Sequence, residues 1–162
     1  MRPISIFPMM AALIWMGLAL PLGAQSLSER EGWVSQTTQV PYADLIDAVK
    51  AATKANKMGV VTEAGPTGMA AKRGITIPGN RVIGVFNNDF AVRILALSTA
   101  AMIEAPIRMY VTENDDGTGT LSYKTPSFVF APYMDEGGAE LEAMAAELDG
   151  RFAAISDAAV QP

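Results

Sequence analysis

The residues that could do chemistry in this sequence are limited by two absences, because the chain contains neither cysteine nor histidine. Thiolate nucleophiles, Ser-His-Asp and Cys-His relays, Cys/His zinc sites, covalent c-type haem and disulfides all need one of these residues. We therefore expect no cofactor and no metal. Acid–base work would fall to carboxylates, tyrosines and lysines, and the sequence shows no paired arrangement of them.

The clearest hairpin pattern lies between residues 107 and 124. Two short strands, expected at 107–113 and 119–124, flank the turn sequence Asn114-Asp115-Asp116-Gly117. A two- or four-residue loop would place Val111 opposite a polar residue. A three-residue loop pairs it with Leu121 and puts glycine where a type I turn with a bulge needs it. The three-residue register is therefore expected, with these residues on the core face: Met109, Val111, Leu121 and Tyr123.

The other face of this hairpin carries an unbalanced charge. Arg108 and Lys124 become cross-strand neighbours, a like-charge pairing that ordinarily destabilises a sheet. Something acidic should lie between them: a carboxylate of the chain such as Glu63 or Glu113, or simply water if the face is open. The alternative is a small anionic ligand or a carboxylate of a partner subunit. In that case two polar side chains of the same face would supply hydrogen bonds: Tyr110 and Ser122.

A second polar group follows the strand expected at 81–86. Asn87, Asn88 and Asp89 offer oxygens suited to capping a helix, and together with Arg93 they could instead line a pocket. Capping explains at least two of the three, and the binding role stays open as the alternative. The acidic residues around Gly117 lack the later glutamate that an EF-hand requires, so we interpret them as a turn.

Apolar periodicity predicts the elements that position these side chains. Long amphipathic helices are expected at 42–57 and over the closing stripe from Leu141 to Ala159. The order is strand, helix, a run of strands with a small helical excursion, and a closing helix. This order predicts an α+β domain in which an antiparallel sheet of about six strands carries the two long helices on one face. The strands are expected at 33–40, 58–63, 81–86, 107–113, 119–124 and 127–131.

The N-terminus has the pattern of a secretory signal peptide at residues 1–24. A positive start and an apolar run lead through Pro21 to the small residue Ala24, after which cleavage is expected. An uncleaved membrane anchor is the alternative, which Pro8, Pro21 and the missing basic flank oppose. The expected product is periplasmic or secreted, with no stable membrane anchor after cleavage.

Behind the signal we expect a loose lead-in at 25–36 and a single domain at 37–160. The 162-residue chain has 12 basic and 17 acidic side chains, and its formal net charge is −5. An acidic, exported domain without a basic cluster is not expected to bind nucleic acid.

Four segments in succession resemble the bacterial family called domain of unknown function 302. They are YADLIDAVKAATKANKMGVVTE, ITIPGNRVIGVFNNDFAVRIL, APIRMYVTENDDGTGTLSY and the closing helix. The resemblance implies a topology like that of the TATA-box-binding protein (TBP) and a homodimer. Its members often carry Asn-Pro after the central strand, with a nearby cysteine or histidine. Here Asn88 replaces the proline and Phe86 takes the expected cysteine position, so only Asn87 matches and no thiol or imidazole chemistry carries over.

Three function classes follow from this sequence. The first is a small-ligand-binding or sensing module that acts as a dimer and takes an anionic or apolar ligand. The second is a structural or interaction protein that uses the open sheet face. A carboxylate-based enzyme is third, and two carboxylates facing each other across a cleft would favour it.

Overall fold

The computed structural model describes residues 29–161. The signal peptide predicted at 1–24 lies outside the described residues. Among the residues described, no helix has the length and apolar character needed to cross a bilayer.

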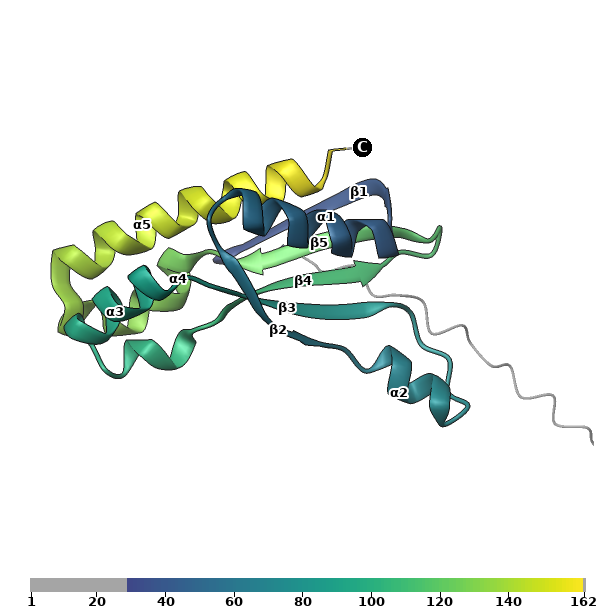
Figure 1. Cartoon of the computed structure of the whole chain (residues 1–162), viewed down its shortest axis with the longest axis horizontal. Helices are drawn as coiled ribbons and strands as arrows, with labels where there is room; N and C mark the ends of the chain where they lie inside the picture. The colour runs from purple at the N-terminus through teal and green to yellow at the C-terminus, as the bar shows by residue number, and fades with distance from the viewer. Residues whose placement is uncertain (1–28, 162) are drawn as a thin grey trace, which may run out of the picture.

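One antiparallel sheet of five strands organises the described chain, in the order β1-β5-β4-β3-β2 (Figure 1). The first strand pairs with the last, so β1 and β2 form the two edges and the hairpin β4–β5 lies inside the sheet. The α+β class and the antiparallel sheet are confirmed. The strands are β1 (Trp33–Pro41), β2 (Gly59–Ala64), β3 (Asn80–Phe86), β4 (Ile107–Glu113) and β5 (Thr118–Lys124).

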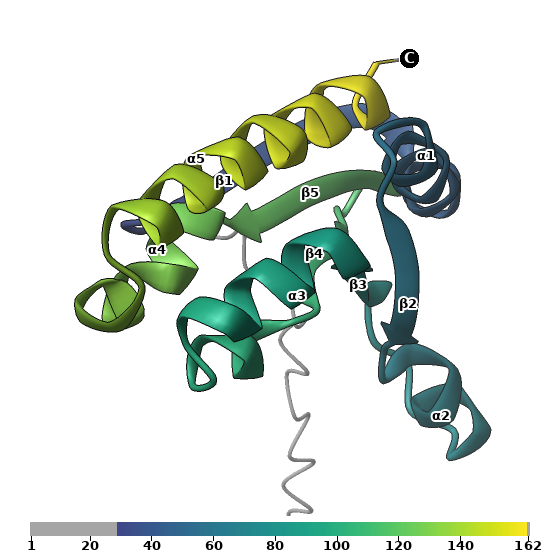
Figure 2. The ribbon, with the colours of Figure 1, turned by 60° about the vertical axis from the view of Figure 1, so that its left-hand side comes forward.

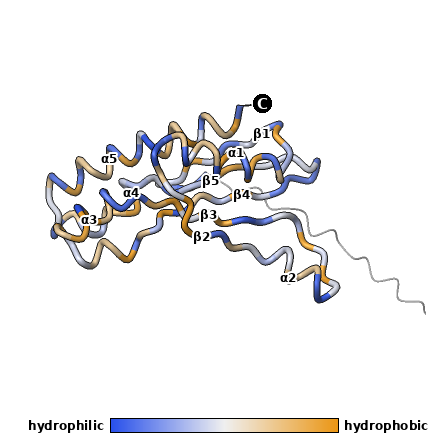
Figure 3. The backbone as a smooth tube through the Cα atoms, in the orientation of Figure 1, coloured by the Kyte–Doolittle hydropathy of each residue, from blue (hydrophilic) through white to orange (hydrophobic). Residues whose placement is uncertain are grey.

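The long helices α1 (Tyr42–Ala55) and α5 (Met134–Ala159) lie on the same side of this sheet (Figure 2). Figure 3 shows apolar and polar residues alternating along α5. The helix turns sharply at Gly138, where φ is +55°. The predicted apolar stripe of α5 is confirmed, because each of its members is at most 3% exposed: Leu141, Met144, Ala145, Leu148, Phe152, Ile155 and Ala159.

Shorter helices complete the described chain. The helix α3 (Asn88–Leu97) packs against α5, and α4 (Pro126–Phe130) leads into α5. Single 3₁₀ turns are formed by η1 (Ala101–Glu104) and η2 (Ala131–Tyr133). The helix α2 (Thr67–Lys72) extends away from the other helices in both views and buries none of its residues (Figures 1 and 2).

The predicted register of the β4–β5 hairpin is confirmed. Val111 lies opposite Leu121, and Met109 lies opposite Tyr123. Gly117 has a φ of +81°, the left-handed conformation that the third position of this turn needs. The four core-face residues are at most 4% exposed.

The sixth strand, predicted at 127–131, is wrong, because this segment forms α4 and the start of η2. The Thr125 side chain accepts a hydrogen bond from the Phe128 amide, and Pro126 occupies the first helical turn. The Ser127 amide donates to Asp149 of α5 at 2.9 Å. A run of only four apolar residues, 128–131, does not distinguish strand from helix by its period, and here the cap of the helix decided.

The first strand begins where the sequence predicts it, because β1 starts at Trp33. Residues 33–36 therefore belong to the sheet, and the loose lead-in expected at 25–36 overlaps the strand at these four positions. Their partners on β5 run from Lys124 to Leu121.

Replacing each of two glycines with alanine should change the free energy of unfolding in opposite directions. Gly150 lies within α5 with open space around a Cβ, so Gly150→Ala should raise the free energy of unfolding by about 1 kcal/mol. At Gly65 a Cβ would lie 2.1 Å from the backbone oxygen of Asn80, so Gly65→Ala should lower it by about 1–3 kcal/mol. Urea unfolding followed by circular dichroism measures both values. Equal effects of the two substitutions would contradict the packing described here.

Candidate functional site

Polar and aromatic side chains cross the sheet face that α1 and α5 leave uncovered. Strand pairing aligns them in three rows, and continuing the β4–β5 register by one residue places Arg108 opposite Lys124. The rows are Gly84, Arg108, Lys124 and Trp33; Val82, Tyr110, Ser122 and Ser35; and Asn80, Thr112, Thr120 and Thr37.

A cleft of about 760 Å³ lies over this face, and its lining includes residues of all three rows. Its floor comes from β1, β3, β4 and β5, and its walls come from η1 and from α4 with η2. Three of the predicted site residues line it together: Arg108, Tyr110 and Lys124. The other lining residues are Trp33, Asn80, Val82, Glu104, Ile107, Phe128, Val129, Ala131 and Pro132.

Trp33 forms an aromatic part of the cleft floor, in the same row of the sheet as Arg108 and Lys124. The Lys124 ammonium lies 5.8 Å from the centre of the Trp33 ring system, and the Arg30 guanidinium lies at the same distance. Both contacts are within the range of a cation–π attraction. Lys124 is therefore held at the cleft by an aromatic ring and by its position on β5.

The polar side chains of this face differ in how many of their hydrogen-bonding groups already have a partner within the protein. The Asn80 amide donates to the Tyr110 hydroxyl, so the Tyr110 proton remains free to be donated elsewhere. Ser122 is fully buried and its hydroxyl is 2.9 Å from that of Ser35. The Ser122 side chain is therefore engaged with Ser35 beneath the cleft, and Ser122 is not among the lining residues.

Neither carboxylate expected to balance the cations does so. Glu63 pairs with Lys50 and with Arg81, each at 3.3 Å, and Glu113 accepts a hydrogen bond from the Gly79 amide at 2.6 Å. Among residues 29–161, neither Arg108 nor Lys124 forms an ion pair with a carboxylate.

Glu104 is the one carboxylate among the lining residues. The Tyr133 hydroxyl donates to its Oε1 at 2.8 Å. This hydrogen bond raises the pKa of the Tyr133 phenol, because the negative carboxylate favours the protonated donor. Tyr133 thereby holds Glu104 in place at the wall of the cleft.

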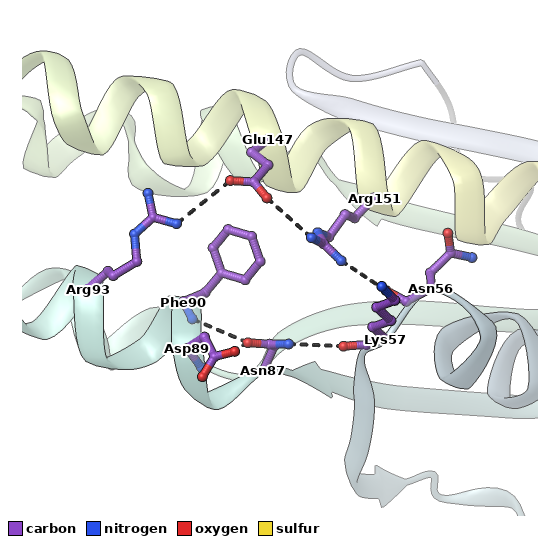
Figure 4. Close-up of polar contacts among 8 residues, drawn as sticks. All are labelled: Asn56, Lys57, Asn87, Asp89, Phe90, Arg93, Glu147 and Arg151. Atoms are coloured by element: carbon purple, nitrogen blue, oxygen red, sulfur yellow. Dashed lines mark hydrogen bonds and ion pairs between the residues drawn. The ribbon is translucent and has the colours of Figure 1, made fainter.

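The other predicted site residues lie elsewhere, between α3, α5 and the turn that joins α1 to β2 (Figure 4). Asn87 caps α3, since its side-chain oxygen accepts from the amides of Asp89 and Phe90. Its amide nitrogen donates to the backbone oxygen of Lys57 at 2.9 Å. Lys57 has a φ of +58°, so this bond holds a turn in a conformation that L residues rarely adopt. Asn88 is exposed in the first turn of the helix.

Arg93 belongs to an ion-pair chain on the same side (Figure 4). It lies 3.7 Å from Glu147, which in turn pairs with Arg151 at 3.2 Å. Arg151 also donates to the backbone oxygen of Asn56 at 3.1 Å. The Phe90 ring contacts both guanidinium groups, at 5.7 Å and 5.2 Å. The structure therefore brings Asn87 and Arg93 together in a network that joins helices, apart from Arg108 and Lys124.

The space beside Asn87 is small. Its apolar pocket, which includes Phe86, Phe90 and Phe130, has a volume of about 30 Å³, enough for about one water molecule. The residue at the expected cysteine position, Phe86, thus lies against a nearly filled core.

Asp116, in the acidic turn of the hairpin, accepts hydrogen bonds from within the turn itself. Asp116 accepts from the Thr118 hydroxyl and amide, and these bonds hold the pKa of the Asp116 carboxyl below its ordinary value. Within residues 29–161 no group of three or more acidic side chains is placed to hold a metal ion.

Sequence reasoning predicted three of the twelve lining residues and missed the other nine. Trp33, Glu104 and Phe128 come from segments far apart in the chain, and nothing in their local patterns marks them as neighbours of Arg108. The pairing of β1 with β5 brings Trp33 beside Lys124, and the helical form of 126–130 brings Phe128 to the same place.

Comparison with known proteins gives a family and a fold. A family model described as domain of unknown function DUF302 matches residues 34–159. The crystal structure of an uncharacterized conserved protein DUF302 from Bacillus stearothermophilus aligns with a TM-score of 0.70 and 18% identity, over 82% of this chain and 100% of that chain. At this identity the likeness supports the fold alone. No match is found among curated proteins.

Asn87 should prove important for stability. Asn87→Ala removes the α3 cap and the bond to Lys57, so the free energy of unfolding should fall by about 2 kcal/mol. Asn87→Asp keeps a capping oxygen and loses only the donor, so its loss should be about half as large. Urea unfolding measures both values. The exposed neighbour Asn88→Ala is the control, and a loss there equal to that of Asn87→Ala would contradict the role of Asn87.

Proposed function

The chain belongs to the domain of unknown function 302 family, and from this premise we propose that it is a small-ligand-binding or sensing module that holds an anion in the open-face cleft. The observation that carries the proposal is the position of Arg108 and Lys124. They occupy one row of the sheet and line the same cleft, without a carboxylate partner among the described residues.

Electrostatics favour an anion at this point. Cross-strand neighbours have Cβ atoms about 5 Å apart. Two like charges at about that separation repel by about 1 kcal/mol at the dielectric constant of water and by about 3 kcal/mol at an effective value of 20. An anion bound between them adds two attractions, which together outweigh that repulsion. The formal net charge of the whole chain is −5, so the cationic row is a local exception on an acidic protein.

Hydrogen bonding supports the same ligand chemistry. The Arg108 guanidinium and the Lys124 ammonium are donors only, and the free Tyr110 proton adds a third donor in the cleft. Catalysis has less support, because Glu104 has no second carboxylate facing it among the lining residues.

Our proposal extends to cellular location and assembly. The signal sequence predicted at 1–24 would direct export, so the module would act in the periplasm or as a secreted protein. The strand, helix, strands and helix order is consistent with a TBP-like topology. The family resemblance supports a homodimer.

A second candidate is an assembly module that uses the same face. Phe128 is 38% exposed and lies beside Ala131 and Pro132 at the rim of the cleft, where a partner subunit would cover it. In that case a carboxylate of the partner subunit would neutralise Arg108 and Lys124.

Replacing both cations tests the anion site. A tight-binding anion present at ten times its dissociation constant should stabilise the wild type by about 1.4 kcal/mol and raise the Tm by about 4 °C. Arg108→Gln with Lys124→Gln should fold normally and lose this shift. Thermal unfolding with acetate, benzoate, phosphate, sulfate and octanoate at constant ionic strength measures it.

The matched control replaces two exposed lysines elsewhere, Lys54→Gln with Lys72→Gln, and should keep every shift that the wild type shows. If no anion shifts the wild type more than the double variant of Arg108 and Lys124, the anion site is wrong. Native mass spectrometry of both proteins tests the second candidate, because a dimer lost only in the double variant would favour assembly.

A further inference from the structure

We infer that the ligand of this cleft is an amphiphilic monoanion, with one carboxylate-like head on an apolar chain or ring. The inference rests on the proposed anion site and specifies its ligand class. It depends on three features of the cleft: its apolar lining, the construction of its aromatic wall and the balance of its charges.

The lining is too apolar for a small hydrophilic anion. Seven of its twelve residues are apolar, and a bare phosphate or acetate would leave them in contact with water. The volume of about 760 Å³ is also far more than such an ion needs and lies in the range of pockets that hold drug-sized molecules. The apolar residues are Trp33, Val82, Ile107, Phe128, Val129, Ala131 and Pro132.

The aromatic wall is held in place by the backbone. A Cβ at Gly32 would lie 2.0 Å from the nearest ring atom of Phe128, and Gly32 has a φ of +71°. Only glycine allows the Phe128 ring to lie this close to the chain next to Trp33. The Thr125 cap of α4 holds the other end of the segment that carries the ring. An apolar ligand body would therefore meet a wall that is already ordered, which lowers the entropic cost of binding.

The charges of the cleft favour a ligand with one negative charge. Arg108 and Lys124 are positive and Glu104 is negative, so the lining residues sum to +1, while Arg30 lies against the Trp33 ring outside the lining. A single anionic head between the two cations satisfies this balance. A second anionic group on the same ligand would be repelled by the Glu104 carboxylate, which Tyr133 holds in position.

Isothermal titration of the full chain with four matched compounds tests the ligand class: octanoate, acetate, 1-octanol and octanedioate. Each buried methylene strengthens binding by about fourfold, so contact with three or four of them should make octanoate bind about 60- to 250-fold more tightly than acetate. Octanol lacks the head and octanedioate adds a second charge. Both should bind at least about tenfold more weakly than octanoate.

Variants separate the head from the body. Arg108→Gln with Lys124→Gln should weaken octanoate by at least about tenfold and leave octanol unchanged. Phe128→Ala should weaken octanoate by about tenfold and leave acetate unchanged, whereas Met69→Ala, which removes an apolar side chain that is 61% exposed on α2, should change neither. Glu104→Gln should bring octanedioate closer to octanoate.

Fluorescence provides an independent readout. Trp15 and Trp33 are the two tryptophans of the chain, and Trp15 lies in the signal peptide predicted at 1–24. Trp33 is therefore the single emitter of the cleaved protein, and Trp15→Phe makes it the single emitter of the full chain as well. Octanoate should shift the emission of Trp33 over the same concentration range in which it saturates the heat of binding. Saturable heat with an unchanged emission spectrum would place octanoate outside the cleft and overturn the inference.

The outcomes distinguish the ligand class from the anion site. If acetate or phosphate binds as tightly as octanoate and loses binding in the double variant, the anion site stands and the amphiphilic ligand is wrong. If octanoate and octanol bind equally and the double variant changes neither, the cleft is only an apolar surface and both proposals fail. Circular dichroism and the Tm of each variant show whether the fold is intact.

Discussion

The three-residue turn between β4 and β5 determines on which face of the sheet each residue of the hairpin lies. A slip of one residue would move every side chain of one strand to the opposite face. The turn is held by the left-handed conformation of Gly117 and by the bonds from Thr118 to Asp116. The same register that places Val111 and Leu121 under the helices also places Arg108 opposite Lys124. The core and the unbalanced cations are therefore two consequences of one turn.

The two faces of the sheet differ in what covers them. The buried face is covered by α1 and α5, whose apolar stripes match it. The other face keeps its polar rows and is walled at one end by α4, η1 and η2. Because Arg108, Tyr110 and Lys124 stand on paired strands, their positions are set by the sheet. A binding site built this way needs little rearrangement when a ligand enters.

Phe86 and Asn87 lie in a region with a structural role. Asn87 starts α3 and holds the turn at Lys57, and the Arg93, Glu147 and Arg151 chain joins α3 to α5. The volume left there is about 30 Å³. The residues expected from the sequence as one set of ligand contacts therefore divide into a network that joins helices and a cleft on the opposite side of the sheet.

Periodicity and turn chemistry by themselves determined the hairpin register, the stripe of α5, the cap at Asn87 and the cross-strand position of Arg108 beside Lys124, because each depends on residues close in the chain. Tertiary structure decided the rest. Segment 127–131 is helical partly because Thr125 caps it, a local signal that the strand prediction overlooked, and partly because Asp149, on a distant helix, accepts the Ser127 amide. The cleft exists because β1 pairs with β5 and brings Trp33 to Lys124, a contact between residues 91 positions apart that no local pattern encodes. Glu63 illustrates the same limit, since the chain fold paired it with Lys50 and Arg81 and left the two cations of the open face without a carboxylate.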